Sequence, residues 1–191
     1  MSRWWDSAAW VLWRVRALLW LGRSARALEL LQRLRPRHPH DAALLATHAH
    51  LLAETGRLEE ALALLDELVR LQPNGAAHWF NRGYVQERLG LATAAEASLR
   101  RALQLDERLD RAWYGLGLAL LAQGRTDEAL QAFKRNTELQ PMSPYAWAQM
   151  ARIHADRAET EEVRRIIRHL QGFEPKVAAQ LARETGLSPS G

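Results

Sequence analysis

The sequence predicts an all-α protein in which antiparallel helix pairs stack side by side. Three observations support this fold class: a 34-residue period, amphipathic segments of helical spacing within each period, and no segment with the alternating pattern of a strand. Four residue types share the period and its phase, which chance does not explain. They are Gly22, Gly56, Gly90 and Gly124; Ala27, Ala61, Ala95 and Ala129; Pro39, Pro73, Pro141 and Pro175; and Trp79, Trp113 and Trp147.

This period divides most of the chain into five repeats, which follow an N-terminal extension at residues 1–7. After them, apolar residues at helical spacing predict a C-terminal capping helix at 178–187 and a tail at 188–191. Such a helix would cover the apolar face that the last repeat leaves exposed. The repeats are residues 8–41, 42–75, 76–109, 110–143 and 144–177.

The fourth repeat shows how each period becomes two helices. Trp113, Leu116 and Leu120 recur at helical spacing and predict the first helix. Phe133 and Asn136 continue the apolar stripe on the second helix. Because Asn136 occupies an apolar position of the pattern, its amide needs hydrogen-bond partners if it is buried.

Turn and capping residues predict where these helices begin and end. Gly124 is expected to adopt the left-handed conformation that ends the first helix, and Ala158 replaces this glycine in the fifth repeat. Asp110 and Thr126 are expected to cap the first and second helices of the fourth repeat.

These positions carry a family resemblance. The run Trp113, Leu116, Gly117, Leu120, Ala129, Phe133 and Pro141 resembles the tetratricopeptide repeat (TPR), and the resemblance covers residues 8–177. It implies a right-handed α-solenoid of five TPR helix-turn-helix repeats plus the capping helix. It also implies that the first helix of each pair lines a concave groove, in which a segment of another protein binds.

Composition argues against catalysis and against a cofactor. The chain has no cysteine, which excludes disulfides, thiolate zinc sites, iron–sulfur clusters and cysteine nucleophiles. No glycine-rich phosphate loop follows a strand, and no serine-elbow motif is present. His48 and His50 lie about 200° apart around a helix and cannot share a metal ion. We therefore expect a non-catalytic protein with no metal and no cofactor.

The positive charge is confined to the first fifth of the chain. The net charge is +4, but residues 1–40 hold eight arginines against Asp6 and Glu29, so the remainder sums to −2. This distribution disfavours nucleic acid as the partner. Arg14 and Arg16 interrupt the most apolar stretch, which excludes a signal peptide or a membrane span there, and we expect a cytoplasmic location.

The repeat phase indicates which side chains face the groove. Arginine and aromatic residues dominate this set, as they do in binding hot spots. The expected partner segment carries an acidic group near Arg111 and apolar anchors against Phe80, Tyr84 and Tyr114. Alternatively, some of these rings only fill space between adjacent first helices. The candidate groove residues are Arg16, Trp20, His50, Phe80, Asn81, Tyr84, Arg88, Arg111, Tyr114, Leu118, Tyr145 and Arg152.

The carboxylate clamp of chaperone-tail-binding TPR proteins is not expected here. That clamp is built from two lysines, two asparagines and an arginine. The corresponding positions of this chain hold Ala46, His50, Asn81, Arg111 and Gly115. Only Asn81 matches, and Arg111 keeps the positive charge.

Five of the eight tryptophans lie in the first 20 residues, and Trp13, Arg16 and Trp20 share one helical face. Three interpretations stay open. The helix packs within its own chain; the face docks another protein or a second copy; or the indoles and nearby arginines lie on an anionic membrane surface. The last alternative would place the protein peripherally on the inner face of the membrane.

Overall fold

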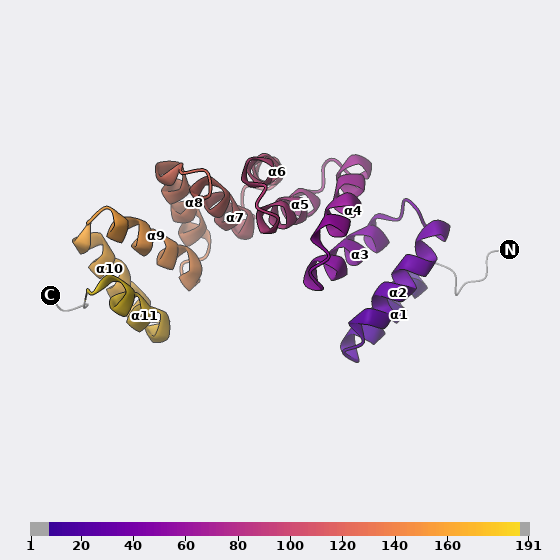
Figure 1. Cartoon of the computed structure of the whole chain (residues 1–191), viewed down its shortest axis with the longest axis horizontal. Helices are drawn as coiled ribbons and strands as arrows, with labels where there is room; N and C mark the ends of the chain where they lie inside the picture. The colour runs from indigo at the N-terminus through magenta and orange to yellow at the C-terminus, as the bar shows by residue number, and fades with distance from the viewer. Residues whose placement is uncertain (1–7, 188–191) are drawn as a thin grey trace. The chain divides into compact units, whose positions relative to one another are not determined.

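The computed structural model describes residues 8–187, and each repeat contains a pair of α-helices (Figure 1). Over this range there are eleven α-helices, one short 3₁₀ helix and no strand, so the predicted fold class is confirmed. The extension at 1–7 and the tail at 188–191 lie outside the described residues. The elements are α1 (Ala8–Trp20), α2 (Ser24–Leu34), η2 (Arg35–Arg37), α3 (Ala42–Glu54), α4 (Leu58–Leu71), α5 (Ala76–Arg88), α6 (Ala92–Leu105), α7 (Asp110–Leu121), α8 (Thr126–Leu139), α9 (Pro144–Asp156), α10 (Thr160–Gln171) and α11 (Pro175–Thr185).

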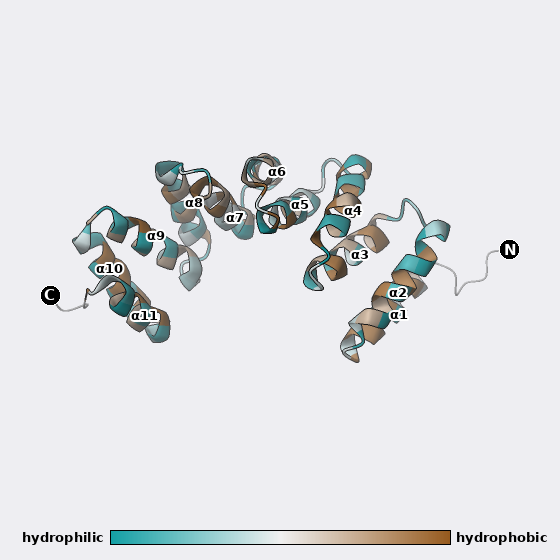
Figure 2. Cartoon of the chain, in the orientation of Figure 1, coloured by the Kyte–Doolittle hydropathy of each residue, from teal (hydrophilic) through white to brown (hydrophobic). Residues whose placement is uncertain are grey.

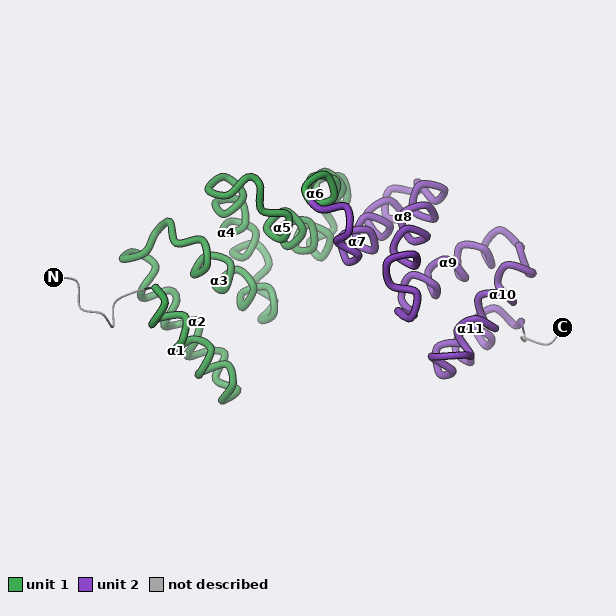
Figure 3. The backbone as a smooth tube through the Cα atoms, turned by 180° about the vertical axis from the view of Figure 1, so that it is seen from behind, with its two compact units in different colours: residues 1–105 green, residues 106–191 purple. Residues whose placement is uncertain are grey.

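The chain divides into two compact units, residues 1–105 and 106–191 (Figure 3). In unit 1, α1, α3 and α5 pack against α2, α4 and α6 respectively, and α2 and α4 each also contact the next first helix. The core is aliphatic, with Val15, Leu52, Leu65 and Leu68 buried. Each of these helices carries both apolar and polar residues, as expected of amphipathic helices (Figure 2).

Unit 2 contains α7 to α11, and α11 packs on both α9 and α10. Its core includes Phe133, Ile166, Ile167 and Leu181, all essentially inaccessible to solvent. Gly117 allows α7 and α8 to approach closely, because a Cβ atom added there would lie 2.4 Å from Phe133 Cε1.

The turn glycines adopt the predicted left-handed conformation. Gly124 has a φ of 72°, and Gly22, Gly56 and Gly90 have φ between 68° and 80°. Ala158 adopts the same conformation, with φ at 58°, although it has a Cβ. The repeat geometry therefore imposes this turn even where the sequence lacks glycine.

The predicted N-caps of the fourth repeat are wrong by one residue. Asp110 is the first residue of α7 and Leu109 is the cap; Thr126 is the first residue of α8 and Arg125 is the cap. The carbonyls of Leu109 and Arg125 already accept the first helical hydrogen bonds. Instead of a side-chain cap, the Arg125 guanidinium pairs with Glu128 at 2.6 Å in the first turn of α8.

The last helix begins earlier than predicted, at Pro175 instead of residue 178. Proline suits the first turn of a helix because its φ is already helical and its missing N–H is not needed there. The helix ends before Gly186, whose φ is 69°. No helix within residues 8–187 combines the length and apolar character needed to cross a membrane.

Candidate functional site

In unit 1, the candidate groove residues of α5 form a compact aromatic and cationic surface. The rings of Phe80 and Tyr84 stack with centroids 6.4 Å apart, and Arg88 lies over Tyr84 at 5.8 Å. Arg88 also donates a 2.8 Å hydrogen bond to the Ala53 carbonyl on α3, which orients its side chain. Tyr84 remains 44% exposed, so the surface presents a ring held next to a fixed positive charge.

The other predicted groove residues of unit 1 lie on α1, α3 and α5. Arg16 and Trp20 on α1 are exposed, as is His50 on α3. Asn81 on α5 is half-buried.

In unit 2, the candidate tyrosines of α7 and α9 lie next to each other. The Tyr114 and Tyr145 ring centroids lie 6.3 Å apart, and Tyr114 also contacts the buried Phe133 at 5.7 Å. Tyr145 is 67% exposed. Tyr114 thus contacts both Phe133 and Tyr145, and Tyr145 extends this ring cluster into solvent. Leu118 is half-buried.

The two predicted arginines of unit 2 lie in different settings. Arg152 on α9 pairs with Glu184 on α11 at 3.1 Å. Hydrogen bonds from Arg152 and then Gln180 lower the pKa of Glu184 below its ordinary value. Arg152 therefore helps attach the last helix, whereas Arg111 is exposed at the start of α7.

The N-terminal tryptophan face is divided between packing and solvent. Val11 and Val15 provide the buried side of α1, while Trp13 and Trp20 are 65% and 88% exposed. Arg16 on the same face is also exposed. The intramolecular interpretation therefore does not account for these two indoles within residues 8–187.

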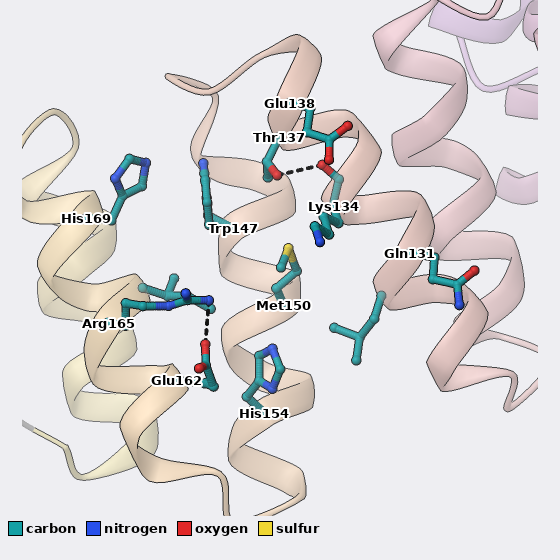
Figure 4. Close-up of a pocket in the computed structure, with 12 residues that line it drawn as sticks. Gln131, Lys134, Thr137, Glu138, Trp147, Met150, His154, Glu162, Arg165 and His169 are labelled. Atoms are coloured by element: carbon teal, nitrogen blue, oxygen red, sulfur yellow. Dashed lines mark hydrogen bonds and ion pairs between the residues drawn. The ribbon is translucent and has the colours of Figure 1, made fainter.

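One feature of unit 2 was not predicted from the sequence. A cavity of about 650 Å³ lies between α8 and α10, with α9 as its floor (Figure 4). It includes none of the predicted groove residues. The one signal in the sequence is a change of residue type at equivalent repeat positions, for example Met150 at the position of Arg82. Among its lining residues are Lys134, Trp147, Met150, His154, Ile166 and His169.

The described ionisable groups form no recognisable metal centre: within residues 8–187, no group of three or more histidine, aspartate or glutamate side chains could hold a metal ion. His48 is buried on α3. Burial lowers its pKa, and the nearby charges of Arg35 and Arg57 lower it further.

Comparison with protein families decides what this helical array is. Two tetratricopeptide repeat models match the chain, one at residues 46–109 and one at 110–143. This is a tetratricopeptide repeat protein. The matches run without a gap from the second repeat to the fourth, in the phase predicted from the 34-residue period. TPR membership supports a protein–protein interaction module.

Solved TPR structures share the fold. MamA from Desulfovibrio magneticus matches with a TM-score of 0.75 at 18% identity, covering 91% of this chain and 94% of that chain. YrrB, described as a TPR protein with an unusual peptide-binding site, matches with a TM-score of 0.75 at 19% identity, with 93% of each chain covered. A TPR protein from Parabacteroides merdae matches with a TM-score of 0.77 at 21% identity, covering 92% of this chain and 72% of that one.

At these identities the likeness concerns the fold. No functionally curated protein matches this TPR chain.

Proposed function

We propose that this TPR protein is a non-catalytic adaptor, scaffold or assembly factor that binds a segment of a partner protein along its first helices. The observation that carries the proposal is the pair of exposed tyrosines, Tyr84 and Tyr145, each held by neighbouring rings on a first helix. Exposed rings that are already positioned lose little conformational entropy on binding, so they suit apolar anchors of a partner.

Two arginines on first helices would supply the charged part of the binding surface. Arg88 is oriented by the Ala53 carbonyl next to Tyr84, and Arg111 lies on α7 with Tyr114. A carboxylate of the partner would form charge-assisted hydrogen bonds with such guanidinium groups. The peptide-binding site in the description of YrrB is consistent with this class of ligand.

Affinity purification from the native organism tests the proposal. The wild-type protein should recover a reproducible partner, and Tyr84→Ala, Tyr145→Ala and Arg111→Glu should each reduce its recovery. Met142→Ala is the matched control because it truncates an exposed apolar residue in the turn before α9. If all three variants recover the same proteins in the same amounts as wild type, the first helices are not the binding surface.

The alternative is a scaffold that associates with itself or with a membrane through α1. The exposure of Trp13 and Trp20 favours this second candidate, since desolvating two indoles would contribute to a docked interface. Light scattering of wild type and Trp13→Ala/Trp20→Ala measures self-association, and co-sedimentation with anionic vesicles measures membrane binding. If the wild-type protein is monomeric and does not co-sediment with the vesicles, both forms of this alternative are ruled out.

A further inference from the structure

The helices α4, α5 and α6 of unit 1 are equivalent to the helices α8, α9 and α10 that line the cavity in unit 2, so the two sets can be compared residue by residue. On α5, Arg82 donates from Nε to Asp66 Oδ1 on α4 at 2.6 Å and from Nη1 to Ser98 Oγ on α6 at 2.7 Å. Ser98 in turn donates to Gln86 Oε1 at 2.7 Å. One guanidinium therefore spans the space between α4 and α6 and satisfies the polar groups around it.

The residues at the same positions two periods later cannot form that network. Met150 stands at the position of Arg82 and lies on α9. Lys134, Ile166 and His154 stand at the positions of Asp66, Ser98 and Gln86. These are the residues that line the 650 Å³ cavity, so the bridge present in unit 1 is replaced by open space in unit 2.

The charge at this position is also reversed. Lys134 replaces Asp66, and it forms no ion pair with any residue in 8–187. The neighbouring charges are already paired: Arg165 with Glu162 and Glu138 with Arg135. Lys134, Met150 and Arg165 converge on the space between α8 and α10 (Figure 4).

The floor of the cavity is apolar. Met150 and Ile166 are buried, and the Trp147 indole already donates its N–H to the Pro141 carbonyl at 2.9 Å. His169 packs against that indole with ring centroids 4.4 Å apart. An occupant would therefore meet hydrocarbon and ring surface at the centre. The charged groups that it would meet are the Lys134 ammonium and the ion-paired side chains of Glu138, Glu162 and Arg165. The volume lies within the range typical of ligand pockets, about 300–1,000 Å³.

We infer that unit 2 carries a second peptide-binding site, between α8 and α10, for a partner-protein segment that places an acidic side chain beside an apolar anchor. The carboxylate pairs with Lys134, and the anchor packs on Met150, Ile166 and Trp147. In unit 1 the Arg82 side chain spans the equivalent position and bonds to both neighbouring second helices. The site shares no residue with the candidate groove residues of the first helices, such as Tyr84 and Tyr145, which we call the first-helix surface.

A labelled hexapeptide with Leu-Trp between two aspartates is the probe, and the same peptide with two asparagines is its control. Fluorescence anisotropy at low salt measures affinity. Methyl-¹³C methionine NMR locates the peptide, because the chain has only three methionines and Met150 lines the cavity. We expect saturable binding of the aspartate peptide, a shift of the Met150 methyl signal, and binding about tenfold weaker for the asparagine peptide.

Three variants test the site. Lys134→Asp should weaken binding by about tenfold or more, because repulsion replaces attraction. Lys134→Asp/Met150→Arg restores the arginine–aspartate pair of the bridge in unit 1 and should abolish binding. Lys176→Asp changes the only other lysine of the chain, on α11, and should bind as wild type does. Circular dichroism checks that each variant folds. Because Lys134 is exposed, Lys134→Asp should fold normally, and its binding tests the site even if the double variant does not fold.

Binding that is absent in the wild type, equal for the two peptides, or unchanged in Lys134→Asp would overturn the inference. Tyr84→Ala and Tyr145→Ala should bind the probe normally. If these variants lose binding while Lys134→Asp keeps it, the peptide occupies the first-helix surface; the second site is then refuted and the proposed function is supported.

Discussion

Trp113 Nε1 donates a 2.8 Å hydrogen bond to the backbone carbonyl of Glu107, six residues earlier and before the start of α7. Trp79 and Trp147 form the same bond with the Pro73 and Pro141 carbonyls, at 2.8 and 2.9 Å. The recurring tryptophan therefore ties the first helices α5, α7 and α9 to the turns that precede them. Because the acceptor belongs to the backbone, Glu107 replaces the usual proline without loss of the bond.

Trp113→Phe should lower the free energy of unfolding by about 1–3 kcal/mol, because it removes the donor and part of the packed ring. Urea denaturation measures the change. Glu107→Ala keeps the carbonyl and should stay within about 0.5 kcal/mol of wild type. Equal stability of Trp113→Phe and wild type would show that the indole hydrogen bond is unimportant.

Gly117→Ala should destabilise the protein by about 1–3 kcal/mol, even though alanine favours helix by about 1 kcal/mol over glycine. The new Cβ would lie 2.4 Å from Cε1 of the fully buried Phe133 ring, which has little room to move. Gly172→Ala is the comparison, since the nearest atom there is 3.4 Å away. Thermal unfolding should separate the two, and a Gly117→Ala variant as stable as Gly172→Ala would contradict the close-approach argument.

Ala158→Gly should raise stability by about 0.5–1 kcal/mol, because glycine adopts a φ of 58° without the Cβ penalty. The larger entropy that glycine loses on folding offsets part of this gain. Ala155→Gly, within α9, should have the opposite effect by about the same amount. Both changes are measurable by chemical denaturation. A loss of stability in Ala158→Gly would mean that the alanine turn is not strained.

Stability should fall as the pH is lowered from about 7.5 to 5.5. Burial, and then Arg35 and Arg57, lower the pKa of His48 in the folded state. The unfolded chain therefore takes up a proton near the ordinary histidine pKa of about 6.5 while the folded chain resists it, so acid favours unfolding. Burial lowers the pKa of His78 in the same direction.

His48→Leu should make the melting temperature less dependent on pH over this range, because the variant has no group to titrate at that position. The Nε2 atom of His48 is buried without a hydrogen-bond partner, so leucine costs no polar contact there. His78→Gln is the parallel variant for the second histidine. An identical pH dependence in His48→Leu and wild type would assign the effect to other groups.

The helix pairs could be read from the sequence because their signals are local. Gly124 and its counterparts mark the turns, and the apolar stripe of each helix repeats within a few residues. Asn136 is buried, and its amide has the hydrogen-bond partner that burial was expected to require: it donates to the Asp110 carbonyl at 2.7 Å. Cap positions were less predictable, because whether a helix begins at Asp110 or one residue later depends on which carbonyl accepts the first bond.

The candidate surfaces were only partly predictable. Repeat phase places Tyr84 and Tyr145 on first helices, but the exposed fraction of each ring depends on its neighbours. Nothing local to Arg152 indicates that it pairs with Glu184, which is 32 residues later on another helix. Long side chains reach across elements, so a residue type that suits partner binding can instead hold the fold together.

The sequence by itself determined that this chain folds into tandem TPR helix pairs, because a repeated pattern of small, apolar and turn residues dictates each hairpin separately. Only the tertiary structure decided where space is filled and where it is left open. Met150 and Arg82 occupy equivalent positions, yet one lines a cavity and the other bridges two helices. That difference arises from side chains of three helices meeting at one point, which no single stretch of sequence contains.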